Sequence, residues 1–507
     1  MAITIAKLNL LAKFFLSYHK NIIFLVLDMT KWFLNNKCIF VIIYSIFFLL
    51  FLNNSYLYDQ DEAAYAGFAR NMIESNDILL LDFPFSEPHR KPPLHFWITA
   101  LSFKIFGESE FTLRIFPAIW IFLTYALTYL LSSKIYNQRV AFFSFLILSC
   151  SLYFPLNGKI ALVDGLLTFL QFSAIYLLYL HFFEDHPYAK YLFWFVLSLG
   201  ALTKGPPIYI LSMGILFFAV FNKDLRKKVW SLHPWFFLPI SVIPLFVWGY
   251  FLWERTNGAL IRWMIDWYIL RRATNPVFGQ YGPPGTYLIL FFVGLFPWSY
   301  FLIYTLKDLF NKFINIFIKR NTKNNLDYFI IATLISSWIV YEFMMSKLPS
   351  YVLVAYPILS MSIANILDKN FELYKKKIKI ISILSIIMGI FVLVFLAEFN
   401  SIRKDTFELA NQIKQIIKKA EMIYFAKDYA VPSLAYYLDY PKQSIEILKS
   451  INTIKNLQNN SLLVIDKDSL TLLEKEKIEI LSKKKLYLYD RNRSLELFVI
   501  RLKNNKR

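Results

Sequence analysis

Long apolar stretches without charged residues recur along most of this 507-residue chain and constrain its fold more than any other feature. Many approach the ~20 residues that a helix needs to cross the ~30 Å hydrocarbon core of a bilayer. Only 18% of the residues are charged, against about 25% in a typical soluble protein. The sequence therefore excludes a soluble or disordered chain. It predicts an α-helical polytopic membrane protein, with the candidate spans at 38–53, 112–133, 139–157, 160–182, 190–203, 205–221, 232–253, 287–306, 326–345, 350–366 and 378–397. These amount to about 11 transmembrane helices.

The two ends of the chain differ from this central region. Residues 1–36 are apolar but are interrupted by lysines, and no small-residue cleavage site follows, so they favour an interfacial helix over a signal peptide. From about residue 400 the composition is that of a soluble protein. An amphipathic helix is expected at 404–419, and short apolar runs follow at Met422–Phe425, Leu462–Ile465, Leu486–Tyr489 and Leu497–Ile500. We predict three regions: 1–36, a transmembrane domain at 37–399, and a small C-terminal α/β domain at 400–507.

The net charge of +20 is spread over short segments between the apolar runs. This placement does not favour a nucleic-acid-binding surface. The lysine-rich loops 222–231, 307–325 and 367–378 fall on one side of the predicted membrane, and such loops stay in the cytoplasm because their cations resist translocation. The connections 54–111 and 254–286 and the C-terminal domain are then external. Cys38 and Cys150 lie inside apolar runs, so neither a disulfide framework nor a thiolate metal site is expected.

An acidic pair opens the first external connection. Asp61 and Glu62 precede a predicted helix that contains Tyr65, at the membrane surface. Negative charge is favourable at a helix N-terminus, so the pair could simply cap this helix. A lone Asp-Glu pair would be explained in this way, but cations return to the same region downstream.

The first of these cations are Arg90 and Lys91, followed by Pro92 and Pro93. Two prolines fix φ and stiffen the loop, so Lys91 is presented from a rigid segment. It could be a lysine that only extends its charge to the interface, or a cation that binds a lipid phosphate. Further polar residues follow on the same predicted face: Asp164, Lys204, Arg262, Arg271, Arg272 and Lys347. A carboxylate near the end of a span, such as Asp164, is costly unless it is paired or faces water, so this convergence indicates a functional site.

These residues belong to an ordered series of motifs. The series runs through Asp61–Ala66, Asn71–Asp77, Arg90–Trp97, Phe106–Glu110, Arg114–Pro117, Asp164, Thr203–Gly205, Phe296–Trp298 and Lys347–Tyr351. Over residues 50–360 it resembles the signature of the GT-C glycosyltransferases, which take sugars from polyprenyl-phosphate donors. That family includes protein O-mannosyltransferases and the aminoarabinose transferase that modifies lipid A.

The resemblance implies roles for individual residues. Asp61 matches the family's catalytic aspartate, the base that activates the acceptor. Lys91 and Tyr351 match positions that hold the donor phosphate, and Arg272 matches the arginine there, with Arg271 as a neighbouring candidate. Asp164 matches a second acidic residue at the cavity. Supporting or substrate-contacting positions are expected at Glu62, Tyr65, Arg90, Asp164, Lys204, Arg271 and Lys347.

Departures from the family pattern concern a metal site and specificity. Arg90 stands where the aminoarabinose-transferase branch has an acidic residue before Lys-Pro, and no histidine lies near position 269. We therefore predict no cofactor and no required metal. Ala64 replaces an arginine before the motif's tyrosine, so the sugar or lipid specificity is expected to differ. No Gly-rich nucleotide fingerprint occurs, which fits a lipid-linked donor.

The sequence thus predicts a membrane glycosyltransferase of the bacterial inner membrane with its site on the periplasmic face. It would move a sugar from a polyprenyl-phosphate donor by inverting displacement, with lipid A or another glycolipid as favoured acceptor and a protein hydroxyl as alternative. A secondary transporter is the main alternative from another class. It would show an internal repeat and polar residues at the bilayer midplane, whereas here the polar residues sit at the outer boundary. A non-catalytic scaffold would not need the ordered charged motifs.

Overall fold

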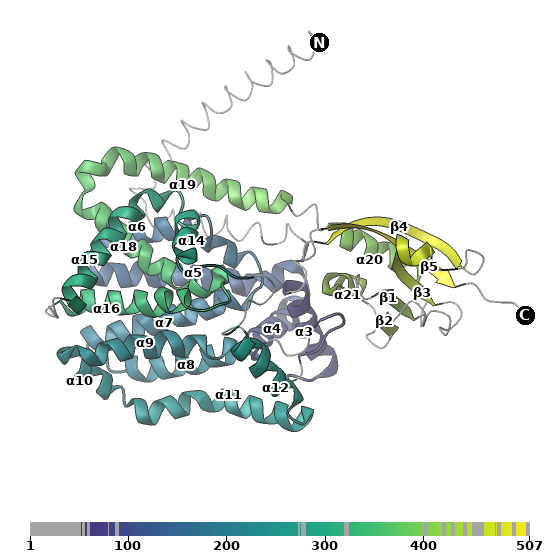
Figure 1. Cartoon of the computed structure of the whole chain (residues 1–507), viewed down its shortest axis with the longest axis horizontal. Helices are drawn as coiled ribbons and strands as arrows, with labels where there is room; N and C mark the ends of the chain where they lie inside the picture. The colour runs from purple at the N-terminus through teal and green to yellow at the C-terminus, as the bar shows by residue number, and fades with distance from the viewer. Residues whose placement is uncertain are drawn as a thin grey trace, which may run out of the picture.

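A helical bundle and a five-stranded sheet make up the described part of the chain (Figure 1). The computed structural model describes residues 52, 56–57, 61–79, 81–86, 91–271, 274, 280–318, 324–399, 404–417, 422–426, 431–439, 444–448, 461–471, 473, 478–488 and 493–502. The interfacial helix expected at 1–36 lies outside these residues. So does the first predicted span, 38–53, apart from Leu52.

The bundle contains a helix at every predicted span from residue 112 onward. Its helices are α5 (Glu110–Ile135), α6 (Gln138–Ser149), α7 (Val163–Phe183), α8 (Ala189–Lys204), α9 (Pro207–Phe221), α10 (Lys223–Ser231), α11 (Pro234–Thr256), α12 (Ala259–Met264), α14 (Thr286–Gly294), α15 (Leu302–Phe313), α16 (Asn325–Leu334), α17 (Val340–Glu342), α18 (Ala355–Lys369) and α19 (Phe371–Phe399). Within the described residues, α5, α7 and α11 are each long and apolar enough to cross a membrane as one unbroken helix. The described part of the chain is therefore mostly helical, as predicted, and three of its helices have the length and composition of membrane spans.

Burial separates the centre of the bundle from its periphery. The most apolar window of α7 is 83% buried, whereas that of α11 is only 17% buried. Helix α7 therefore lies in the protein interior, packed against α5 and α8. Helix α11 runs along the edge of the bundle with exposed apolar side chains such as Trp235, Phe246 and Tyr250, as a lipid-facing helix would.

Several predicted spans are interrupted rather than continuous. The 287–306 stretch is α14, then Pro297 and a 3₁₀ turn at Trp298–Phe301, then α15. The 326–345 stretch passes from α16 through a π-helical segment, Ile335–Ile339, into α17. The 139–157 stretch leaves its helix at Ser149 and ends in a 3₁₀ turn at Phe154–Gly158. Pro297 lacks the N–H that would continue a helix, which explains the break after α14. Apolar periodicity gives no signal for a π-helical segment, so the sequence did not predict the break in the 326–345 stretch.

Two short helices cover one end of the bundle, where external juxtamembrane helices were predicted. Helix α3 (Glu62–Ser75) packs on α4 (Leu94–Phe106), which packs on α5. Helix α4 begins directly after Pro92-Pro93 and ends at Gly107, whose φ of +81° favours glycine. The lysine-rich α10 lies at the opposite end of the bundle, together with the end of α15 and the start of α16 (Figure 1).

The C-terminal region folds around a mixed sheet with strand order β2-β1-β3-β5-β4. Strand β1 pairs in parallel with β2 and β3, whereas β5 runs antiparallel to β3 and β4. The elements are α20 (Lys404–Ile416), β1 (Ile423–Ala426), α21 (Pro432–Leu438), β2 (Ile445–Leu448), β3 (Leu462–Asp466), α22 (Lys467–Thr471), β4 (Ile478–Leu488) and β5 (Arg493–Leu502).

Sequence patterning located most of this sheet. The four predicted apolar runs coincide with β1, with β3, with the end of β4 and with part of β5. The edge strand β2 was missed, because only Ile445 and Leu448 of its four residues are buried and no long apolar run marks it. One face of the sheet packs with α20, α21 and α3 in a shared apolar core that includes Leu57, Phe68, Ile413, Phe425 and Leu434. The C-terminal region and the first connection therefore lie on the same end of the bundle.

Candidate active site

Asp61, Tyr65 and Lys91 form a continuous polar chain at the start of α3. The Tyr65 hydroxyl donates to Asp61 Oδ1 at 3.4 Å, and Lys91 Nζ donates to the same hydroxyl oxygen at 2.5 Å. Tyr65 is fully buried, whereas Asp61 and Lys91 are half-buried. The buried tyrosine thus holds a carboxylate and an ammonium from two separate segments next to each other, with both charges at the edge of the protein interior.

Glu62, the neighbour of Asp61, is placed quite differently. Its carboxylate is completely buried and accepts two hydrogen bonds from Arg114 of α5, at 2.7 and 2.9 Å. It also accepts the Ala161 backbone N–H at 2.9 Å, while Arg114 donates to the carbonyls of Leu52 and Tyr56. A buried ion pair with all its partners in place joins the pieces of backbone that contribute to it. Glu62 therefore supports the site by fixing α3 against α5 and the segment before α7.

A second ion pair joins the ends of two bundle helices. Asp164, in the first turn of α7, accepts a hydrogen bond from Lys204 Nζ, in the last turn of α8, at 2.5 Å. Asp164 also lies within electrostatic range of Lys91. The Lys204 ammonium lies 5.4 Å from the centre of the Tyr351 ring. The tertiary structure therefore gathers Asp61, Lys91, Asp164, Lys204 and Tyr351, which come from five separate parts of the sequence.

His95 lies in the middle of this group, although sequence analysis gave it no role. Its ring meets Tyr65 edge-on at 5.8 Å, and it lies within electrostatic range of Lys91 and Asp164. Burial, reinforced by the nearby Lys91 charge, lowers the pKa of His95 to about 4, so the imidazole is neutral. Its Nε2 atom has no hydrogen-bond partner within the described ranges. The sequence contained one signal for His95, because this residue lies four positions after Lys91 at the start of α4.

Two predicted site cations are used locally instead. Lys347 is buried, and its ammonium donates to the backbone carbonyls of Glu342, Met344 and Tyr341 at 2.6, 3.2 and 3.4 Å, which closes the end of α17. The side chain of Arg271 is 54% exposed and pairs with Asp266 at 2.7 Å. The other two predicted cations, Arg90 and Arg272, lie outside the described residues.

Metal ligation is not indicated by the geometry of the described residues, among which no cluster of three or more His, Cys, Asp or Glu side chains is placed to hold an ion. The expectation that no metal is required therefore stays a prediction.

Part of the chain matches known sequence families. Residues 90–253 match the family model described as dolichyl-phosphate-mannose-protein mannosyltransferase. An uncharacterized protein of Aquifex aeolicus (strain VF5) is 34% identical over 219 residues, which cover 40% of this chain and 43% of that protein. The undecaprenyl phosphate-alpha-4-amino-4-deoxy-L-arabinose arabinosyl transferase of Wigglesworthia glossinidia brevipalpis is 26% identical over 360 residues, 69% of this chain and 62% of that protein. The chain thus spans less than two thirds of the length of either relative.

The fold has solved counterparts that cover more of the chain. ArnT from Cupriavidus metallidurans, in complex with undecaprenyl phosphate, superposes with a TM-score of 0.74 at 16% identity, over 92% of this chain and 98% of that one. The oligosaccharyltransferase AglB from Archaeoglobus fulgidus superposes with a TM-score of 0.52 at 12% identity, over 78% of this chain and 62% of that one. These matches agree with the resemblance carried by the sequence motifs: residues 90–253 are similar to the mannosyltransferase family model, and the chain has the fold of ArnT.

Proposed function

We propose that this protein is a membrane glycosyltransferase that transfers a sugar from a polyprenyl-phosphate donor to an acceptor hydroxyl. The observation that carries the proposal is the meeting of Asp61 with Lys91, and of Asp164 and Lys204 with Tyr351, at one end of a bundle with the fold of ArnT. The ArnT structure contains undecaprenyl phosphate, and the arabinosyl transferases named above are similar over 69% of this chain.

The negative charge that develops on the leaving phosphate explains why the site needs cations. As the bond between the sugar carbon and the phosphate oxygen breaks, negative charge grows on the phosphate. Fixed hydrogen-bond donors at that position stabilise the transition state more than the ground state. Lys91 and the Tyr351 hydroxyl fit this role, because Lys91 is held by Tyr65 and by two prolines, and Tyr351 by its position beside Lys204. We assign Arg272 the same role on the family resemblance alone.

Asp61 is proposed as the general base. The acceptor oxygen forms a bond to the sugar carbon while its proton passes to the Asp61 carboxylate, and the polyprenyl phosphate leaves from the opposite face. No second carboxylate is required as a nucleophile. Asp164 is already paired with Lys204, so one direct displacement with inversion is favoured, by analogy with inverting glycosidases.

The acceptor has two candidates. Lipid A or another glycolipid is favoured because of the similarity to aminoarabinosyl transferases over most of the chain. A protein hydroxyl is the second candidate, because the family model that matches residues 90–253 is described as a protein mannosyltransferase. Mass spectrometry of lipids and surface glycoproteins, with and without the gene, separates them. Loss of a sugar from a glycolipid supports the first, and loss from a protein supports the second. An unchanged sugar inventory in both fractions would refute the proposed function.

We further propose that the site faces the periplasm of a bacterial inner membrane. The described parts of the lysine-rich segments lie at the end of the bundle away from α3, and positive loops stay in the cytoplasm. Labelling of single cysteines with an impermeant reagent in spheroplasts tests this. Ser75→Cys and Glu446→Cys should react in intact cells, and Lys227→Cys on α10 should react only after lysis. All three positions are exposed. The reverse pattern would place the site in the cytoplasm.

A further inference from the structure

The segment that carries Asp61 has little to fix it from its own sequence. Asp61 makes no side-chain cap to α3, and α3 is a 14-residue helix that lies outside the transmembrane bundle. Isolated helices of about 12–15 residues are marginally stable in water. Arg114 fixes Glu62 and the Tyr56 carbonyl on either side of Asp61. The C-terminal domain adds a second set of contacts to the same segment.

Before Asp61, the chain is held by Tyr437 of α21. The buried Tyr437 hydroxyl accepts the backbone N–H of Leu57 at 2.8 Å and donates to Glu110 Oε1, at the start of α5, at 3.0 Å. The Tyr56 ring packs on Phe407 and Tyr437, with ring centres 4.9 and 6.1 Å apart. One hydroxyl group of the C-terminal domain thus ties the approach to Asp61 to a bundle helix.

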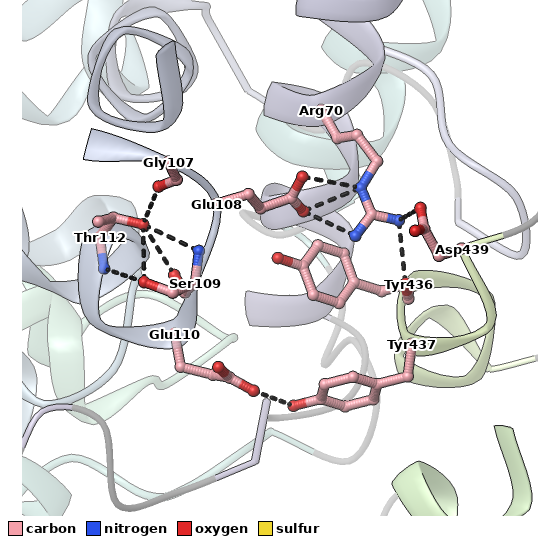
Figure 2. Close-up of polar contacts among 9 residues, drawn as sticks. All are labelled: Arg70, Gly107, Glu108, Ser109, Glu110, Thr112, Tyr436, Tyr437 and Asp439. Carbon is pink, nitrogen blue, oxygen red and sulfur yellow. Dashed lines mark hydrogen bonds and ion pairs between the residues drawn. The ribbon is translucent and has the colours of Figure 1, made fainter. Parts of the chain in front are cut away.

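After Asp61, α3 is held by an arginine between two carboxylates (Figure 2). Arg70 pairs through two nitrogens with Glu108, just before α5, and donates to the Tyr436 carbonyl at 2.9 Å. Its guanidinium also pairs with Asp439 at 3.2 Å and lies 4.1 Å from the centre of the Tyr436 ring. This side chain is only 14% exposed, so these contacts are largely shielded from solvent. Arg70 therefore joins α3, the α4–α5 turn and α21 at one point.

We propose that α21 is a clamp that positions the catalytic segment, which makes the C-terminal domain a working part of the active site rather than an appended module. The clamp consists of Tyr437 on the segment before Asp61 and Arg70 with Tyr436 and Asp439 on the helix after it. Tyr437 and Arg70 are positioning residues, since they reach Asp61 only through the backbone that they hold. The expected effect of the clamp on catalysis rests on the proposed function, but whether α21 holds α3 in place can be tested without a substrate.

The experiment uses the full-length protein in lipid nanodiscs with two variants. Tyr437→Phe keeps the ring and removes the hydroxyl, and Arg70→Met keeps the length of the side chain and removes its charge. Each should raise amide hydrogen exchange across 62–75 while exchange in α7 stays unchanged. Each should lower kcat roughly tenfold to a hundredfold, because small displacements of a catalytic group have effects of that size. The KM for the polyprenyl-phosphate sugar should change much less than kcat.

Tyr424→Phe is the matched control. Tyr424 lies in β1 of the same domain, but on the opposite face of the sheet, in a separate apolar cluster. It should leave both exchange and kcat at wild-type values. Wild-type exchange across 62–75 in both Tyr437→Phe and Arg70→Met would overturn the clamp, whatever reaction the protein catalyses. Faster exchange with unchanged kcat would overturn its positioning role. If the wild type has no transferase activity, the exchange measurement still decides the clamp.

Discussion

Lys91 and Lys347 were both predicted as site cations, and the structure uses them in opposite ways. Lys91 is half-buried in the loop before α4, and its ammonium contacts the hydroxyl of Tyr65 on α3. Lys347 is buried, and its ammonium donates to three carbonyls within six residues of itself. An ammonium has three donors. All three donors of Lys347 bind carbonyls at and just after the end of α17, so this charge supports the fold and is not available to a phosphate.

The adjacent residues Asp61 and Glu62 also differ in their burial and in the residues that they contact. Asp61 is half-buried and meets a tyrosine that also binds a lysine, whereas Glu62 is completely buried against Arg114. The Asp61 carboxylate remains partly accessible to solvent, whereas the Glu62 carboxylate holds helices together. Changes at these positions should therefore separate an effect on catalysis from an effect on stability.

The largest effect is expected for Asp61→Asn. The amide keeps the shape and can still accept from Tyr65, but it cannot take up the acceptor proton. The transfer rate should fall by about 10²–10⁴-fold, and the melting temperature should stay close to that of the wild type. A purified Asp61→Asn protein that transfers sugar at the wild-type rate would show that Asp61 is not the base.

Glu62→Gln should have the opposite signature. It leaves Arg114 buried without its counter-charge, and removal of one partner from a buried ion pair costs about 3–5 kcal/mol. We expect a lower yield of folded protein and a clear drop in melting temperature, measured with a thiol-independent dye or by calorimetry. If Glu62→Gln melts like the wild type but is inactive, then Glu62 acts on substrate and the assigned division between the two carboxylates is wrong.

Lys91→Ala should weaken binding of polyprenyl phosphate. Loss of a hydrogen bond to a charged group costs about 1.5–3 kcal/mol, or roughly ten- to hundredfold in affinity. Lys190→Ala is the matched control, because Lys190 also lies over a tyrosine ring, at 4.9 Å, but at the start of α8. Its affinity should match the wild type. Equal affinities for Lys91→Ala and the wild type would remove Lys91 from the donor site.

Arg271→Ala should have the smallest effect. Its ion pair with Asp266 is half-exposed, and such surface pairs contribute about 0–1 kcal/mol. Donor affinity and melting temperature should both change little. A tenfold loss of donor affinity would instead show that Arg271 reaches the phosphate when the donor binds, and would favour it over Arg272 as the family's arginine.

The predictable part of the site is the set of residue types at its centre. Asp61, Lys91, Asp164, Lys204 and Tyr351 were all marked by motif and by position on one predicted face, and the structure places them near one another. His95 was missed because a single histidine at the start of an apolar helix gives no pattern. Lys347 was overinterpreted because its carbonyl partners are backbone atoms, which a motif does not display.

The amino-acid sequence by itself determined the class of this protein and the positions of most helices. The thickness of a bilayer sets the length of a spanning helix, and the length of an apolar run can be read directly from the sequence. It also determined that the C-terminal region alternates helix and strand. Only the tertiary structure decided which charges meet. Arg114 and Glu62 are 52 residues apart in the sequence, and Arg70 and Tyr436 are 366 residues apart, so local composition gives no sign that they are in contact. The contact of α21 with the helix that begins beside Asp61 depends on how two folded surfaces fit, which is a property of packing in three dimensions.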